Sequence, residues 1–207
     1  MGKPAAVVFD IGNVLIGWDP RPAVAAAVGD AEAERFLADE DFDFPAWNHE
    51  QDAGRTWGEA EAVGIDSHPH WREHLLSYRR HFDRSMLGPI DDTVSLLREL
   101  HAAGAPLFAL TNWSAELFPL AVKRFDFLRL FRDIVVSGQV GLAKPDPAIF
   151  ALLARRTGLQ PGQCIFVDDS PPNVTAGAAA GFDAILFRDG EQLRRELHDR
   201  DLPVRVH

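Results

Sequence analysis

Five short runs of consecutive apolar residues constrain the fold of this 207-residue chain more than any other feature. The runs are Ala6 to Phe9, Leu107 to Leu110, Ile134 to Val136, Cys164 to Val167, and Ala184 to Phe187. A strand with one face in water alternates apolar and polar residues, so a continuous apolar run indicates a strand that is buried on both faces. Such strands are typical of parallel sheets covered by helices.

Helical patterns separate these runs. The segment Asp91 to Ala103, for example, places apolar residues on one face and stops before Gly104, a common helix terminator. Strand followed by helix, repeated along the chain, favours parallel pairing with helices on both faces of the sheet. The sequence therefore predicts an α/β fold with a doubly wound, Rossmann-like parallel sheet.

Residues 18–86 interrupt this alternation, because they contain no strand-like run and are rich in alanine, histidine, tryptophan and charge. Four candidate helices lie in this segment: Arg21 to Val28, Ala31 to Ala38, Thr56 to Val63, and His70 to Phe82. We expect residues 18–86 to form an inserted α-helical cap, and residues 1–17 and 87–207 to form the core. A cap at this point of the chain would lie over the carboxyl ends of the strands, where ligands bind.

Composition excludes several classes of protein. The formal net charge of −10 disfavours a general nucleic-acid binder, since it repels a phosphate backbone. No apolar stretch approaches the roughly 20 residues of a membrane helix, and no signal-peptide pattern precedes the first strand, so we expect a cytoplasmic protein with no membrane partner. The single cysteine, Cys164, rules out an internal disulfide and lies in an apolar run, which predicts burial. The sequence carries no signal for oligomeric state.

Polar residues follow the predicted strands where the chain leaves the sheet. Asp10 follows the first run, Thr111 the second, and the pair Asp168 and Asp169 the fourth. A buried, unpaired carboxylate is costly, so Asp10 needs a cation or a role in chemistry. Three carboxylates around one bound anion would repel each other strongly without a divalent cation, and oxygen ligands select magnesium.

Four segments together form a pattern that is specific as a set. They are Val7 to Leu15, Leu110 to Asn112, Lys144 to Phe150, and Phe166 to Ser170. With these motifs in order, the chain resembles the haloacid dehalogenase-like superfamily of hydrolases over about residues 5 to 188. The resemblance is to the branch with a helical cap after the first strand and an Asp-x-Gly-Asn-Val motif. It implies a phosphatase that forms an aspartyl-phosphate intermediate.

The resemblance also implies roles for individual residues. Asp10 would be the nucleophile that attacks phosphorus. Thr111 would donate its hydroxyl to the transferring phosphoryl group, and the backbone amides of Asn112 and Trp113 are further candidate donors. Lys144 would neutralise the charge that Asp10 and the phosphoryl group share.

The implied cofactor is Mg²⁺. Its expected ligands are Asp10, the carbonyl oxygen of Gly12, Asp169 and Asp168, together with water and a substrate oxygen. Asn173 is a weaker candidate that would orient Lys144 or a metal ligand.

Gly12 is the main departure from the family pattern. Most phosphatases of the superfamily carry a second aspartate two residues after the nucleophile, where it protonates the leaving group. We consider three possibilities here. A cap residue (His49, Glu50 or Asp52) supplies the proton, water supplies it, or no donor is needed because the leaving group is a good one, such as an anomeric oxygen. We expect the segment Trp47 to Trp57 to be a loop that places His49 and Glu50 against the substrate.

The favoured function is a magnesium-dependent hydrolase of a small phosphomonoester, such as a sugar phosphate. One alternative is a 2-haloacid dehalogenase, but those enzymes usually lack paired acidic residues and carry tyrosine at the position of Gly12. A phosphomutase is disfavoured, because returning the phosphoryl group uses the acid that Gly12 lacks. The remaining alternative is a non-catalytic binding protein that keeps the fold.

Overall fold

The computed structural model describes residues 5–205 and contains a five-stranded sheet in the order β5-β4-β1-β6-β7. The strands are β1 (Ala6–Phe9), β4 (Leu107–Thr111), β5 (Asp133–Val136), β6 (Cys164–Asp168) and β7 (Asp183–Leu186). All neighbouring strands run parallel. Each predicted apolar run forms one of these strands, and the ends shift by one residue at most. The predicted α/β fold with a parallel sheet is confirmed.

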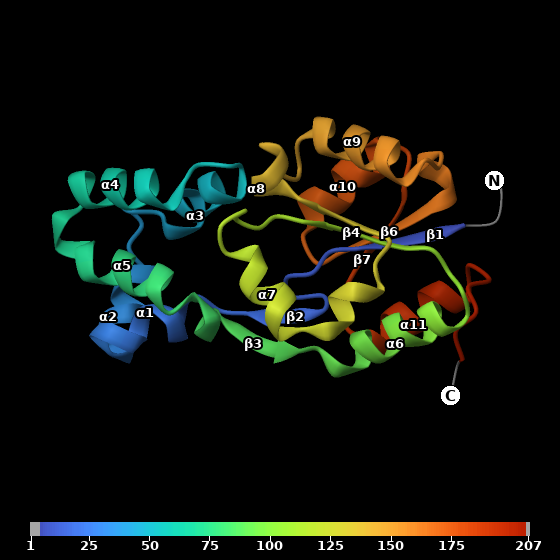
Figure 1. Cartoon of the computed structure of the whole chain (residues 1–207), viewed down its shortest axis with the longest axis horizontal. Coiled ribbons are helices and arrows are strands. Elements are labelled where there is room, and N and C mark those ends of the chain that lie inside the picture. Colours follow the sequence, from blue (N-terminus) through green and yellow to red (C-terminus); the bar gives the residue numbers. More distant parts are fainter. Residues whose placement is uncertain (1–4, 206–207) are drawn as a thin grey trace.

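Helices cover both faces of this sheet. They are α6 (Asp91–Ala102), α7 (Phe118–Arg124), α8 (Ser137–Val140), α9 (Pro147–Thr157), α10 (Pro171–Ala179) and α11 (Gly190–His198), with short 3₁₀ turns η3 (Asp126–Leu130) and η4 (Pro161–Gln163). Val7 and Phe9 pack in one core cluster with α6 and α11, whereas Ala6 and Val8 pack in another with α9 (Figure 1). The alternating side chains of a strand point to opposite faces, so both faces need apolar residues.

Local signals set where the core helices begin. The Asp146 carboxylate accepts a hydrogen bond from the Ala148 amide at 2.8 Å, and Pro147 occupies the first turn of α9. Helix α10 lies close against β6, because a Cβ added at Gly177 would stand 2.7 Å from Cδ1 of Phe166. The first feature sets where α9 begins, and the second shows how closely α10 packs on the sheet.

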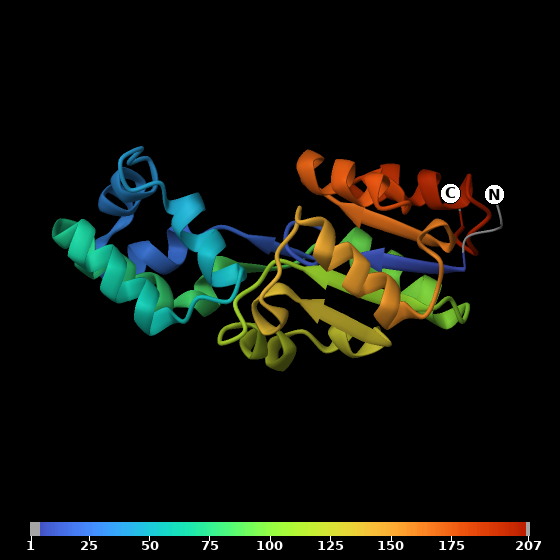
Figure 2. The same ribbon diagram turned by 90° about the horizontal axis from the view of Figure 1, so that it is seen from above.

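A second group of helices lies beyond the carboxyl ends of the central strands (Figures 1 and 2). It comprises α1 (Arg21–Val28), α2 (Asp30–Leu37), α3 (Phe44–Asp52), α4 (Trp57–Ser67) and α5 (Arg72–Arg80), with 3₁₀ turns η1 (Pro69–Trp71) and η2 (Phe82–Ser85). Its interior is aromatic, with Phe36, Phe44, Trp47, Trp57 and Tyr78 all buried. We call this group the cap and keep residues 18–86 as its proposed bounds.

Two features of this region differ from expectation. Short strands β2 (Ile16–Trp18) and β3 (Met86–Pro89) pair antiparallel and connect the core to the cap. The prediction of a loop from Trp47 was wrong, because Phe44–Asp52 is helix α3. The Asp43 carboxylate accepts from the Ala46 amide at 3.0 Å and Pro45 fits the first turn, which together start this helix.

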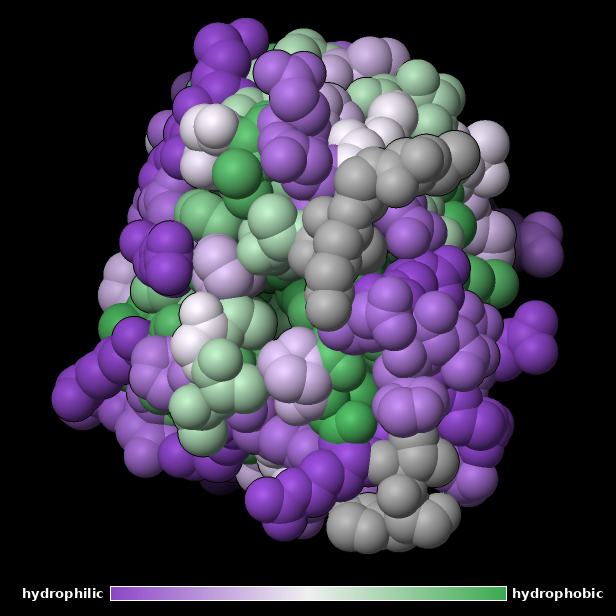
Figure 3. Space-filling model, turned by 90° about the vertical axis from the view of Figure 1, so that its right-hand side faces the viewer, coloured by the Kyte–Doolittle hydropathy of each residue, from purple (hydrophilic) through white to green (hydrophobic). Residues whose placement is uncertain are grey.

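The end of the core that lies away from the cap carries both termini (Figure 2). Its visible surface is mostly hydrophilic, with hydrophobic residues scattered among polar ones (Figure 3). Within residues 5–205, no helix is both long enough and apolar enough to cross a bilayer.

Candidate active site

The sheet brings the predicted acidic residues together. Asp10 directly follows β1, and Asp168 ends β6, the parallel neighbour of β1. One carboxylate oxygen each from Asp10, Asp168 and Asp169 lies within 4.8 Å of the others. Among the residues that the structure describes, this is the only group of three or more histidine, cysteine or acidic side chains arranged to hold a metal ion.

Lys144 is the cation of this cluster. Its Nζ lies 3.0 Å from Oδ1 of Asp10 and 2.6 Å from Oδ2 of Asp168, and it donates to the Leu110 carbonyl oxygen at 3.0 Å. The side chain is only 1% exposed. Burial alone would lower the pKa of the Lys144 ammonium, but the two carboxylates outweigh burial and raise this pKa above its ordinary value. The lysine is therefore charged at neutral pH.

The loop that carries Lys144 is held by Asn112. The Asn112 Nδ2 donates to the Lys144 carbonyl oxygen at 2.8 Å, and the Lys144 amide donates to Asn112 Oδ1 at 2.8 Å. Two reciprocal hydrogen bonds use both ends of the amide side chain. Asn112 thus positions the lysine through its side chain.

Asp168 and Asp169 have different environments. Asp168 is fully buried, and its oxygens accept from Lys144, from the Ser170 amide at 2.9 Å and from Asn173 Nδ2 at 3.1 Å. Asp169 is exposed and lines a cavity next to the cluster. Asn173 thus orients one acidic member of the cluster through its hydrogen bond to Asp168, whereas Asp169 is open to the cavity.

Asp10 is 8% exposed and accepts a hydrogen bond from the Ile11 amide at 2.7 Å. Burial raises the pKa of its carboxyl to about 7, although Lys144 opposes this rise. The cluster thus contains three carboxyl groups, of Asp10, Asp168 and Asp169, and one ammonium group, that of Lys144. An additional divalent cation would balance the charge, and the carboxylate oxygens of the three aspartates are donors that fit Mg²⁺. Gly12, whose carbonyl is the fourth ligand expected from the sequence, lines the adjacent cavity.

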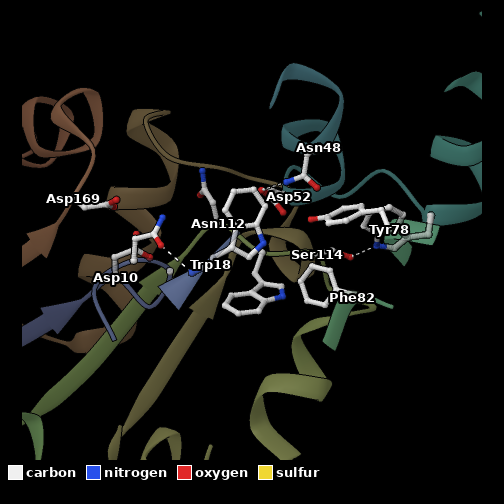
Figure 4. Close-up of a pocket in the computed structure, with 13 residues that line it drawn as sticks. Asp10, Trp18, Asn48, Asp52, Tyr78, Phe82, Asn112, Ser114 and Asp169 are labelled. Carbon is white, nitrogen blue, oxygen red and sulfur yellow. Dashed lines mark hydrogen bonds between the residues drawn. The ribbon is translucent and has the colours of Figure 1, made fainter. Parts of the chain in front are cut away.

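The cavity, of about 190 Å³, lies between the acidic cluster and the cap. Asp10, Gly12 and Asp169 line it from the core, and Asn48 and Asp52 line it from α3 (Figure 4). Much of the remaining wall is aromatic and is formed by Trp18, Trp57, Tyr78, Phe82 and Trp113. The cavity thus joins an acidic end to a largely aromatic end.

The residues predicted to bind the phosphoryl group differ in which of their O–H and N–H groups lack a hydrogen-bond acceptor among the described residues. The Thr111 hydroxyl is buried and has no hydrogen-bond partner within residues 5–205. The backbone amide of Trp113 already donates to Ser137 Oγ at 2.9 Å. Its indole Nε1 is buried, likewise without a partner in the described part of the chain, and the side chain lines the cavity. Any contact of Trp113 with substrate would therefore use its side chain, not the amide that we expected.

The predicted cap residues do not all reach the cavity. His49 and Glu50 are exposed and are absent from its lining, whereas Asn48 and Asp52 line it. Positions 48 and 52 are one helical turn apart and share a face of α3. The substrate contacts of His49 and Glu50 stay predictions. From the sequence, Asp52 is only one of several possible acids and Asn48 is not a candidate, because a loop was expected where α3 forms.

A family model described as haloacid dehalogenase-like hydrolase matches residues 4–181, most of the chain. The chain belongs to this family. The resemblance found from the four motifs is thereby confirmed, and Asp10, Lys144 and Asp168 lie in the part of the chain that the family model covers.

Relatives and solved structures agree with this assignment. The glyceraldehyde 3-phosphate phosphatase of Methanopyrus kandleri is 26% identical, covering 96% of this chain and 90% of the relative. The phosphoglycolate phosphatase of Salmonella typhimurium is 33% identical over 41% of this chain and 34% of its own length. A HAD family enzyme from Bacteroides thetaiotaomicron, solved in complex with magnesium and inorganic phosphate, has a TM-score of 0.72 at 18% identity, covering 90% of this chain and 96% of that one. At that identity the likeness shows the fold.

Proposed function

We propose that this protein is a magnesium-dependent phosphatase that hydrolyses a small phosphomonoester through an aspartyl-phosphate at Asp10. The observation that carries the proposal is the convergence of Asp10, Asp168 and Asp169 with the buried ammonium of Lys144. Family membership and the phosphatases among the relatives support phosphoric monoester hydrolysis.

In the proposed mechanism, the substrate phosphate enters the charged end of the cavity. The Asp10 carboxylate attacks phosphorus opposite the leaving oxygen and forms the acyl phosphate. Lys144, already 3.0 Å from Asp10, stabilises the negative charge that the carboxylate and the phosphoryl oxygens share. The Thr111 hydroxyl, which has no hydrogen-bond partner within residues 5–205, would donate to one of those oxygens. Water then attacks phosphorus, releases inorganic phosphate and regenerates Asp10.

Asp10 and Asp169, with the Gly12 carbonyl, would hold Mg²⁺, while Asp168 mainly fixes Lys144. When bound, the ion reduces the repulsion between the anionic nucleophile and the phosphate dianion. Asp168 acts through Lys144. Its carboxylate accepts a hydrogen bond from the lysine Nζ and so keeps that ammonium group near Asp10. In this arrangement the two adjacent aspartates would have separate tasks.

The fold alone does not distinguish a dehalogenase from a phosphatase. A solved dehalogenase has a TM-score of 0.64 at 20% identity, covering 89% of this chain and 84% of that one. Residue chemistry favours the phosphatase, because the clustered carboxylates would repel a haloacid carboxylate in the absence of a divalent cation. A dehalogenase would also gain nothing from the magnesium that these groups are suited to bind.

The substrate class follows from the size and polarity of the cavity. Its volume of about 190 Å³ accommodates a small metabolite, and its apolar end suits a short carbon skeleton or a sugar ring. We therefore favour small phosphorylated metabolites, including sugar phosphates, as substrates. Separately, we propose that the protein is cytoplasmic.

A screen of phosphorylated metabolites for phosphate release, with and without Mg²⁺, tests the proposal. We expect release that requires the metal, stops with chelator and is absent in Asp10→Asn. Para-nitrophenyl phosphate should be included, because its leaving group needs no proton. If neither the metabolites nor this ester is cleaved in the presence of Mg²⁺, the protein is a binding protein and the phosphatase proposal is wrong.

A further inference from the structure

The proposed mechanism lacks a group that protonates the leaving oxygen. Departure of an alkoxide is unfavourable without a proton, and a positioned acid typically contributes about 10²- to 10⁴-fold. Gly12, two residues after the nucleophile, has no side chain to supply it. If a side chain supplies the proton, it comes from another element that reaches the same cavity.

Asp52 is the cap carboxyl that reaches this cavity. It is the last residue of α3, and its side chain points into the space that Asp10 and Asp169 line from the opposite side (Figure 4). Its Oδ2 accepts a long hydrogen bond, 3.5 Å, from Nδ2 of Asn48. No arginine, lysine or histidine forms an ion pair with Asp52 within residues 5–205, where the ion pairs involve other residues.

The surroundings of Asp52 favour its protonated form. Burial raises the pKa of this carboxyl to about 7, and the negative charge of Asp10 adds to the rise, while Lys144 and the Ser114 amide oppose it. Of the other titratable groups that share the cavity, Asp169 belongs to the core and the Tyr78 hydroxyl to α5. An acid that is half protonated near neutral pH is well suited to give and then retake a proton.

Contacts between cap and core hold Asp52 over the charged end of the cavity. The Trp57 amide donates to Glu116 Oε1 at 2.8 Å, and the Trp57 indole donates to Ser114 Oγ at 2.8 Å. Arg79 forms an ion pair with Glu116 at 3.2 Å. Ser114 and Glu116 lie shortly after β4, so these contacts tie the α3 to α4 connection to the strand end that carries Thr111.

We propose that Asp52 is the acid that protonates the leaving-group oxygen, in place of the carboxyl that position 12 lacks, and that the substrates are phosphomonoesters of aliphatic alcohols. This inference rests on the proposed phosphatase function. Of the three possibilities considered from the sequence, it selects the cap residue over water and over a leaving group that needs no donor. An alkoxide leaving group needs a proton donor, whereas a leaving group that is stable as an anion does not. A carboxylic acid placed to donate a proton therefore favours esters of aliphatic alcohols as substrates.

The proton balance closes over one cycle. As Asp10 forms its bond to phosphorus, the bond from phosphorus to the ester oxygen breaks, and that oxygen takes the proton of Asp52 to leave as an alcohol. In the second step a water molecule attacks phosphorus and gives one of its protons to the Asp52 carboxylate, while the bond between phosphorus and the Asp10 oxygen breaks. Inorganic phosphate leaves, and both aspartates return to their starting forms.

The test compares kcat/KM of Asp52→Asn with that of the wild type for para-nitrophenyl, phenyl and benzyl phosphate at saturating Mg²⁺. Benzyl phosphate loses an alkoxide, whereas para-nitrophenyl phosphate loses a stable anion. We expect the variant to lose about 100-fold or more on benzyl phosphate but less than about threefold on the nitrophenyl ester. Turnover of the nitrophenyl ester also shows that the variant is folded. Asp52→Glu should recover part of the loss.

Asp66→Asn is the matched control, because it makes the same change at an exposed carboxylate of α4. It should leave all three rates unchanged. An equal loss on all three esters in Asp52→Asn would mean that Asp52 binds substrate, and no loss on benzyl phosphate would mean that water is the donor; either result overturns the inference. If the wild type cleaves none of the esters, the phosphatase proposal itself fails.

Discussion

Removal of the Lys144 charge tests the electrostatic arrangement on which the site depends. In Lys144→Met a side chain of similar length remains, but Asp10 and Asp168 lose the ammonium that lies 3.0 Å and 2.6 Å from them. Removal of one partner of a buried ion pair typically costs about 3 to 5 kcal/mol. We therefore expect the free energy of unfolding at pH 8, without metal, to fall by about 3 to 5 kcal/mol.

The pH dependence of that loss has a definite sign. The pKa of Asp10 is already raised to about 7 with the lysine in place, and removal of the lysine raises it further. A carboxyl whose folded pKa exceeds its unfolded pKa of about 4 disfavours folding increasingly as the pH rises between those two values. The variant should thus lose least near pH 5 and most at pH 8, and added Mg²⁺ should restore part of the stability at pH 8.

Urea denaturation followed by circular dichroism, at pH 5 and pH 8 with EDTA or Mg²⁺, measures these effects. Lys123→Met is the control, because Lys123 is exposed on α7. It should change the free energy of unfolding by less than about 0.5 kcal/mol. A loss in Lys144→Met below about 1 kcal/mol at pH 8, or a loss equal at both pH values, would refute the reasoning.

Three further predictions concern the metal, the acid and the packing of the core. Asp169→Asn should weaken Mg²⁺ binding at least about tenfold, since it removes the exposed carboxylate of the cluster; isothermal titration calorimetry measures this, and unchanged affinity would exclude Asp169 as a ligand. For the wild type, kcat/KM for benzyl phosphate should fall as the pH rises above about 7, where Asp52 loses its proton, and this fall should be absent in Asp52→Asn. Gly177→Ala should lower the free energy of unfolding by about 1 to 3 kcal/mol, because the new Cβ would stand 2.7 Å from Phe166. Thermal denaturation measures this as a lower melting temperature. The control Gly58→Ala, with open space at its Cβ, should not lower the melting temperature.

The parallel sheet was predictable because its strands are short and buried on both faces. A continuous apolar run that is followed by polar residues and a helical pattern fits a buried parallel strand better than a half-exposed one. Once the strands were placed, parallel pairing put their polar ends at one edge. The closeness of Asp10, Asp168 and Asp169 therefore followed from topology, without any knowledge of side-chain positions.

The connections between core and cap were not predictable in the same way. Strands β2 and β3 have three and four residues and include Gly17, Gly88 and Pro89, which weaken any local strand signal. The two strands pair because the chain enters the cap through β2 and returns from it through β3, so that the fold places them side by side. Their stability comes from tertiary contacts that a local pattern does not record.

Helix α3 left a signal in the sequence. Asp43 is a good N-cap residue and Pro45 suits the first turn, so a helix over the next two turns was a reasonable expectation. With that helix in place, Asn48 and Asp52 share one face. Which face turns to the core depends on the contacts of Trp57 with Ser114 and Glu116, which join residues almost sixty positions apart.

Anomalous diffraction from a crystal grown with Mn²⁺, as a substitute for Mg²⁺, tests the central claim most directly. We predict one strong peak between the carboxylates of Asp10 and Asp169, with metal–oxygen distances of about 2.1 Å, next to the Gly12 carbonyl. A map with no peak there at saturating Mn²⁺, or with its strongest peak elsewhere on the protein, would contradict the assignment of this cluster as a metal-dependent phosphoryl-transfer site.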